Sequence, residues 1–233
     1  MQITPDSIIF YQYQFVVINA TLVYTWLTMA LLVGGAAWVT KKLVVRPKLP
    51  PWQNFLEIVV DGIYQHIAEV TQQEPEPYLA FVGTLFLFIL TANLLTVVPG
   101  YHAPTGSLST TTALAIAVFV AVPIYGIRQR GILGYLKGYL QPTPIMLPFQ
   151  IIGEFSRTLA LAVRLFGNIM SGNLLAAILL ALVPLFVPVA MNLLGLVFGV
   201  IQAYVFAILA LVYIASAATV QEKKQSISME ENS

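Results

Sequence analysis

Polar and charged residues follow one another at helical spacing inside an apolar stretch near the end of the sequence. Arg157, Arg164 and Ser171 recur every seven residues, and Asn168 follows Arg164 by four. Residues at these spacings lie on one face of a helix. Glu154 precedes Arg157 by three residues and is close enough to pair with it. Arg164 is then left without a carboxylate of its own in this stretch.

An unpaired arginine in a membrane helix has few ways to be stabilised. Its pKa exceeds about 12, so it stays charged, and at the bilayer centre it costs roughly 2.5–3.5 kcal/mol on insertion scales. The Arg164 charge must therefore be stabilised by water, by backbone carbonyls or by an acid on another chain. A structurally capped arginine is the alternative, which its mid-helix position disfavours. Gln202, in the next apolar segment, is a candidate to hydrogen-bond Arg164, although a purely local hydrogen bond is also open.

The composition is that of a membrane protein. Hydrophobic residues make up 58% of the 233 residues and charged residues 9%, whereas soluble domains carry about 25% charged residues. The absence of cysteine excludes disulfides and thiolate metal sites. We expect no metal site and no cofactor, because the two histidines are far apart and no nucleotide-binding motif is present. No basic run suggests a nucleic-acid partner.

The hydropathy pattern predicts one all-α membrane domain with about five membrane helices and one interfacial amphipathic helix. We expect three ordinary spans, at residues 16–39, 79–98 and 110–127, and a surface helix at 52–71. A hairpin of two long helices should follow at 148–183 and 187–218, and then a polar tail at 220–233. Basic clusters after the first and third spans place those ends in the cytoplasm. The N-terminus is then outside and the C-terminus cytoplasmic.

Three of these segments have distinctive shapes. The amphipathic segment 52–71 lies on the membrane surface or packs on its own protein; the pattern leaves both open. A helix of about 36 residues is ~54 Å long, so the hairpin must lie strongly oblique in a ~30 Å hydrocarbon core. A break near Gly167 or Gly172 is the competing explanation, and Pro123 predicts a kink in the third span.

Small residues suggest that another helix approaches closely. Gly153, Ala160 and Gly167 are seven residues apart, on a face beside the polar stripe, and Gly195 and Gly199 form a small-xxx-small pair on the last helix. Such positions allow close helix contacts in lipid.

The motifs together resemble subunit a of F-type ATP synthases. "RLFGN" at 164–168, "IQAYVFAILALVYIASA" at 201–217 and "YLQPTPIMLP" at 139–148 carry the resemblance, and it covers nearly the whole chain after the first span. It implies a non-catalytic stator subunit, with ATP chemistry on other chains. Two ion half-channels would reach a rotating ring of c subunits, each with a membrane-embedded acid.

The resemblance also assigns roles and partners. Arg164 would face the ring and attract its carboxylates, Gln202 would be its neighbour, and Asn168 a polar companion. The expected partners are the c-subunit ring, b-type peripheral stalk subunits, other F-type ATP synthase subunits and membrane lipid. The expected location is a bacterial plasma membrane, with the thylakoid membrane as the alternative.

Two positions depart from the family pattern. Asn173 and Ser107 stand where family members commonly carry acids. Neutral oxygens suit a path for Na⁺, whereas a proton path profits from titratable groups. We therefore favour Na⁺ over H⁺, as in the sodium-type bacterial branch, with Glu154 or an acid on another subunit as the route by which protons could still be carried.

Two other classes compete with a stator subunit. A self-contained channel or secondary transporter would need its own embedded countercharge and usually an inverted repeat, and the sequence shows neither. A structural scaffold would explain the oblique hairpin but would leave Arg164 without a purpose.

Overall fold

A computed structural model describes Asp6 and residues 9–13, 16–41, 51–71, 74–98, 100–140, 146–182 and 187–219. Within these ranges, five helices are long and apolar enough to cross a membrane. The protein is therefore an all-α, multi-pass membrane protein, as the sequence predicts. The expected basic cluster at 42–48 and the polar tail at 220–233 lie outside the described residues.

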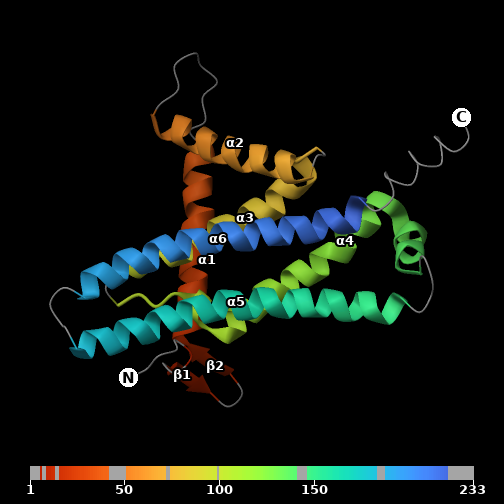
Figure 1. Ribbon diagram of the computed structural model, residues 1–233. Helices are drawn as coiled ribbons and strands as arrows, with labels where there is room; N and C mark the ends of the chain where they lie inside the picture. Colours follow the sequence, from red (N-terminus) through yellow and green to blue (C-terminus); the bar gives the residue numbers. More distant parts are fainter. Residues whose placement is uncertain are drawn as a thin grey trace, which may run out of the picture.

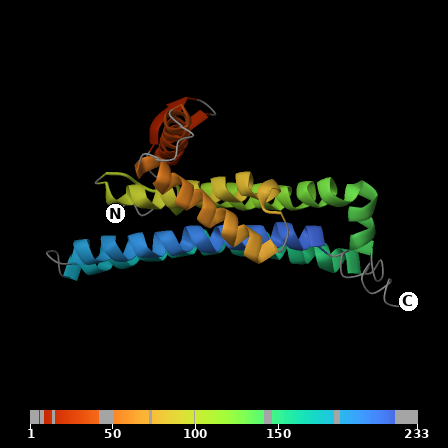
Figure 2. The same cartoon turned by 90° about the horizontal axis from the view of Figure 1, so that it is seen from above.

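The helices form layers (Figure 2). Helix α1 (Ala20–Thr40) stands apart, α3 (Glu76–Leu94) and α4 (Leu108–Leu140) form a middle layer, and α5 (Met146–Leu182) lies beside α6 (Val187–Thr219). Figure 1 shows that α5 and α6 run across the direction of α1. This crossing fits the expected obliqueness of the hairpin, because helices in one bilayer that differ so in direction cannot all follow its normal.

Helix α5 is continuous. Its 37 residues show no interruption at Gly167 or Gly172, so the competing explanation of a broken helix is wrong. At 1.5 Å per residue it is roughly 55 Å long. The main core lies where the middle layer meets the hairpin, with Ile89, Val118, Leu165 and Phe206 at or near zero exposure.

The N-terminal end corrects the sequence prediction. Residues 16–19, expected to begin the first span, form strand β2 (Val16–Asn19), which pairs antiparallel with β1 (Ile9–Tyr13). β-Branched and aromatic residues fit a pleated strand better than a helix. Helix α1 consequently begins at Ala20, four residues later than predicted.

Helix α2 (Pro51–Thr71) settles how the amphipathic segment packs. Ile67 is 1% exposed and lies against α3 and α6, and the rings of His66 and Tyr204 are 5.7 Å apart. This half of α2 is therefore docked on its own protein. Gln53, near the start of α2, is also buried. Ile58 remains exposed.

The α3–α4 connection folds back against α1. It contains the short 3₁₀ helices η2 (Leu95–Val97) and η3 (Pro104–Gly106). Tyr24 donates its hydroxyl to the carbonyl of Gly100 at 2.8 Å, and the Thr28 and Tyr101 hydroxyls lie 2.9 Å apart. Burial raises the pKa of Tyr101, so its hydroxyl stays protonated at neutral pH.

The kink in α4 is elsewhere than predicted. Gly131 has φ 72° and ψ 164°, where the helix direction changes, whereas Pro123 lies in regular helix. A positive φ suits glycine because it has no Cβ. Beyond the kink a second helical segment runs to Leu140, and the part of α4 that is apolar enough to cross a membrane is Leu108–Gln129.

Candidate functional site

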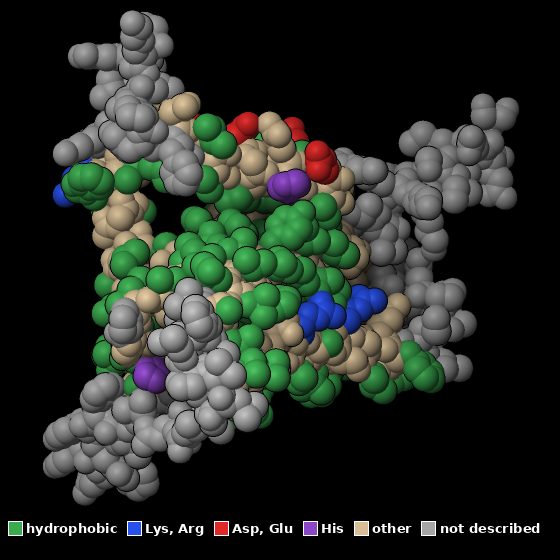
Figure 3. All heavy atoms as spheres, turned by 60° about the vertical axis from the view of Figure 1, so that its left-hand side comes forward, with side chains coloured by type: hydrophobic (Ala, Val, Ile, Leu, Met, Phe, Trp, Pro, Cys, Tyr) green, Lys and Arg blue, Asp and Glu red, His purple; other side chains and the backbone are tan. Residues whose placement is uncertain are grey.

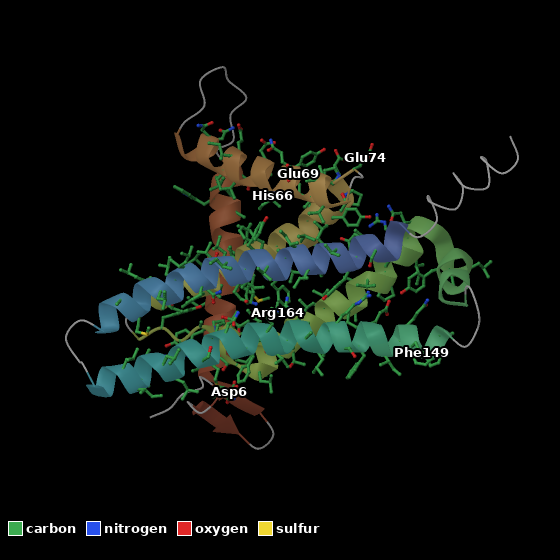
Figure 4. The ribbon with its side chains drawn as sticks, in the orientation of Figure 1. Asp6, His66, Glu69, Glu74, Phe149 and Arg164 are labelled. Atoms are coloured by element: carbon green, nitrogen blue, oxygen red, sulfur yellow. The ribbon has the colours of Figure 1, made fainter. Side chains whose placement is uncertain are left out.

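Arg164 lies in the central part of α5, where α6 runs alongside (Figure 4). Its side chain is exposed in the isolated chain. Among the described residues, no hydrogen bond, ion pair or ring contact involves Arg164. The guanidinium therefore has its donors free for a group outside this chain.

Gln202 pairs with Asn168 rather than with Arg164. The Asn168 Nδ2 donates to Gln202 Oε1 at 2.5 Å, across the hairpin. Gln202 is 3% exposed, and its Nε2 is buried without a partner. The expected Gln202–Arg164 hydrogen bond is thus replaced by a bond to the residue one helical turn further along α5. This bond joins the two long helices next to the arginine.

The other stripe residues have separate surroundings. The Arg157 guanidinium lies over the Tyr213 ring of α6, 5.6 Å from its centroid, which is a cation–π contact. Glu154 is half-buried, and Asn173 is exposed further along α5. Ser171 donates to the backbone oxygen of Asn168 at 3.0 Å, so its hydroxyl is used locally. The Glu154–Arg157 ion pair stays a prediction.

The small-residue face of the hairpin is open. A Cβ placed on Gly153, Gly167 or Gly195 would meet no atom of another described element within 4 Å. Gly199 differs, because there a Cβ would lie 2.7 Å from the Asn93 Cβ. Figure 3 shows a small group of basic side chains within a mainly hydrophobic face, with further basic atoms at the edge of that face. In this chain, three of the four glycines are available to a neighbour and Gly199 packs internally.

A second polar group lies at the Ala20 end of α1. Ser107 is fully buried, and its Oγ donates to Asp6 Oδ2 at 2.6 Å. Thr21 donates to Asp6 Oδ1 at 2.7 Å, and the Ser107 and Ser109 hydroxyls are 2.6 Å apart. We call these four residues the Asp6 cluster. Sequence reasoning selected Ser107 but missed Asp6; the available signal was that Asp6 is the sole charged residue among the first forty.

A buried amide connects this region with α6. Asn93 accepts a hydrogen bond from Thr105 at 2.9 Å and donates to the Gly199 carbonyl at 3.0 Å. Thr105 belongs to η3, which also contacts α5. Gln202 follows Gly199 by three residues on α6. Polar groups therefore succeed one another from Ser107, through the interior, to the Asn168–Gln202 pair beside Arg164.

The predicted site residues thus fall into two places. Arg164, Asn168 and Gln202 come together, Ser107 lies in the Asp6 cluster, and Arg157, Glu154 and Asn173 occupy other turns of α5. The fold and site define a multi-pass helical membrane protein whose interior carries polar groups suited to moving a small ion.

Comparison with known proteins identifies the family. Residues 22–215 match the model of the ATP synthase A chain. The chain is 98% identical to the ATP synthase subunit a 2 of a Picosynechococcus species, over all of both chains. It is 58% identical to the ATP synthase subunit a 1 of Crocosphaera subtropica, over 96% of this chain and 97% of that one. The ATP synthase subunit a 1 of Chlorobaculum parvum is 54% identical, over 97% and 100%.

The chain belongs to the ATP synthase A chain family. Its function is accordingly that of a stator subunit of the ion-transporting F0 membrane sector, and its partners are other ATP synthase subunits. This assignment decides against the self-contained transporter and the scaffold. The ion, and the roles of individual residues, are taken up below.

Proposed function

We propose that Arg164 is the stator arginine that faces a ring of c subunits. The observation that carries this proposal is its exposed guanidinium, halfway along α5, with no partner among the described residues. A fixed cation in low dielectric stabilises an ionised acid and lowers the pKa of that acid. A ring carboxylate arriving without its ion would therefore be held opposite Arg164.

The open glycine face supports the same partner. Gly153 and Gly167 lie on α5 beside the polar stripe, and no atom of this chain fills the space in front of them. A helix of a c subunit could approach closely there, because glycine lets backbones come together in lipid. The exposed apolar residues around this face would be covered by the same ring.

The polar groups between Ser107 and Gln202 form the proposed outer half-channel. Thr105, Ser107 and Asn93 are buried although they are polar, and buried polar groups in a membrane protein mark ion routes by default. In this proposal an ion enters near η3, reaches the ring close to Asn168, and leaves by a second half-channel that Glu154 and Arg157 border. Asn173 lines the ring-facing side of α5.

The remaining assignments complete the proposed assembly. A b-type peripheral stalk would hold this chain still while the ring turns, and lipid would cover the rest of the surface. The N-terminus would lie outside, and the C-terminus in the cytoplasm of a cyanobacterial-type cell, in its plasma or thylakoid membrane. ATP chemistry would take place on other subunits.

Replacing Arg164 tests the role directly. In the whole complex reconstituted in liposomes, Arg164→Ala is expected to abolish ATP synthesis driven by an ion gradient, while the detached soluble motor still hydrolyses ATP. Arg128→Ala, which removes an exposed arginine of α4 shortly before the kink at Gly131, is the matched control and should keep coupled synthesis. Normal coupled synthesis with Arg164→Ala would refute the proposal.

We favour Na⁺ as the transported ion, with H⁺ as the alternative. The neutral oxygen of Asn173 supports Na⁺, whereas the support from Ser107 is weakened because Asp6 brings a carboxylate to its hydroxyl. ATP hydrolysis by the whole complex at alkaline pH should rise with added Na⁺. Identical rates with and without Na⁺, at verified low background sodium, would assign the path to protons.

A further inference from the structure

The Asp6 carboxylate is held by hydroxyl groups. Thr21 donates to one oxygen and Ser107 to the other, and Ser109 lies against Ser107. Thr21 and Ser107 are 5% and 0% exposed, and Asp6 itself is half-buried. The carboxylate thus points from the protein's edge into a buried set of oxygen atoms.

The electrostatic surroundings of Asp6 contain no other formal charge in the sequence segments that build them. Residues 1–40 and 77–127 together carry one charged side chain, Asp6. Among the described residues, no cation pairs with it. A hydroxyl donor stabilises a carboxylate less than a cation does, so the Thr21 and Ser107 hydroxyls solvate the Asp6 carboxylate without supplying a countercharge.

The atoms of the Asp6 cluster suit a small cation. Two carboxylate and three hydroxyl oxygens are available, with no nitrogen donor among the four side chains. Hard monovalent and divalent cations prefer oxygen ligands of this kind. A hydroxyl is both donor and acceptor, so Thr21 and Ser107 can turn their lone pairs toward a cation that replaces their hydrogen bonds to Asp6.

The cluster also has the right position. Ser107 is two residues from Thr105, whose hydroxyl donates to Asn93, which in turn reaches the α6 backbone at Gly199. The 3₁₀ helix η3 contacts α1, α3, α4 and α5. The cluster therefore lies at the beginning of the polar succession that ends near Arg164.

We propose that Asp6 is the cation-loading carboxylate at the outer mouth of the ion path. A cation from outside binds between the Asp6 carboxylate and the hydroxyls of Thr21 and Ser107, and then moves on past Thr105 and Asn93. For Na⁺ the hydroxyl oxygens are ligands; for H⁺ the proton binds a carboxylate oxygen. The proposal rests on the ion-path function above and adds to it a residue that lies 101 positions from its partner Ser107.

The test measures how coupled synthesis depends on cation concentration. Whole complexes are reconstituted in liposomes with the soluble motor outward, a fixed electrical potential is imposed, and the initial rate of ATP synthesis is recorded against luminal Na⁺ and, separately, luminal pH. Asp6→Asn should raise the half-saturating cation concentration about tenfold or more, since a negatively charged mouth raises local cation concentration by that order. The maximal rate should change little.

Matched variants separate loading from folding. Asp61→Asn removes an exposed carboxylate on α2 and should leave the concentration dependence unchanged. Asp6→Glu keeps the charge and should restore most of the affinity. The double variant Asp6→Asn with Ser107→Asp moves the acid by one hydrogen-bond length and should also restore it, which a merely structural role for Asp6 would not predict.

The ion and the failure modes are distinguished by the same data. Thr21→Val should raise the half-saturating Na⁺ concentration if Na⁺ is the cation, because a ligand oxygen is lost. If H⁺ is the cation, losing the hydroxyl that stabilises the ionised carboxylate should instead shift loading to higher pH. Unaltered half-saturation with Asp6→Asn, alongside lost coupling with Arg164→Ala, would overturn the Asp6 proposal alone. If neither variant has an effect, the ion-path function fails as well. If Asp6→Asn does not assemble, failure of the Ser107→Asp double variant to assemble or to load overturns the proposal.

Discussion

Asp6 and Arg164 carry opposite charges in one apolar protein, and they differ in the hydrogen-bond partners that the fold gives them. Hydroxyls of α1 and of the α3–α4 connection approach the Asp6 carboxylate and donate to it. No described residue forms a hydrogen bond or an ion pair with the Arg164 guanidinium. Asn168, one helical turn away, and Gln202, on α6, bind each other instead.

The difference shows which of the two charges is stabilised by hydrogen bonds from this chain. Carboxylates that accept hydrogen bonds from their own protein are stable in the isolated subunit. An arginine that cannot lose its proton must find its counterion elsewhere. The comparison therefore predicts that changes around Arg164 disturb work done with another subunit, whereas changes around Asp6 and its connected amides disturb this chain or its access to ions.

The largest expected effect is at Arg164 itself. Arg164→Lys keeps the charge but loses the planar five-donor fork, so gradient-driven ATP synthesis should fall to a small fraction of normal. Removing one member of a desolvated charge pair costs about 2–5 kcal/mol, and a misplaced ammonium should approach that range. Coupled synthesis by reconstituted complexes gives the measurement. Full activity would mean that a point charge suffices and that no paired contact exists.

The next effect concerns the packing between the two regions. Gly199→Ala places a methyl group 2.7 Å from the Asn93 Cβ, so it should destabilise the protein by about 1–3 kcal/mol through overpacking. Gly195→Ala adds the same methyl group to a space that this chain leaves open and is the control. The midpoint of thermal dissociation of the solubilised complex should drop for the first variant. Equal midpoints would show that α3 and α6 are further apart than described.

A comparable but smaller effect is expected at the hairpin bond. Asn168→Leu deprives Gln202 of its partner while its Nε2 is already buried and unpaired, which should cost about 1–3 kcal/mol of stability. Replacing both Asn168 and Gln202 with leucine removes the unpaired amide and should recover much of that loss. Thermal dissociation of these two variants and of Gln202→Leu completes a double-mutant cycle. A purely additive cycle would mean that the two amides do not interact.

The smallest effect should come from Tyr213. Tyr213→Leu removes the aromatic ring beneath Arg157, and a cation–π contact at an exposed site contributes about 0.5–1 kcal/mol. Tyr213→Phe keeps the ring and should behave like the unmodified protein. The same dissociation assay compares them. A deficit with phenylalanine as large as with leucine would assign the effect to the hydroxyl instead.

Much of this fold could be predicted because a membrane helix is recognised from a local run of apolar residues. The lengths of apolar runs gave the helices α1, α3, α4, α5 and α6, and the seven-residue spacing gave the stripe around Arg164. The errors have local causes too. Proline at position 123 was expected to kink α4, but the helix tolerates it, and Gly131 with its positive φ makes the turn.

The Asp6 cluster could not be predicted by the same means. Asp6 and Ser107 are 101 residues apart, and helical periodicity carries no information about contacts at such separations. The chain between Asp6 and α1 forms strands β1 and β2, and the sequence assigned the residues of β2 to the start of the first span. The Asn168–Gln202 bond was missed for a related reason, since the rotation of α6 about its axis decides which residue of α5 it meets.

The length of α5 gives its residue order a further meaning. In an upright helix, successive turns differ in depth; in a helix of 37 residues that must lean far over, they differ chiefly in sideways position. A neighbour gliding along its flank would pass Glu154, Arg157, Arg164 and Asn168 one after another. The residue order of α5 would therefore set the order in which such a neighbour meets these side chains.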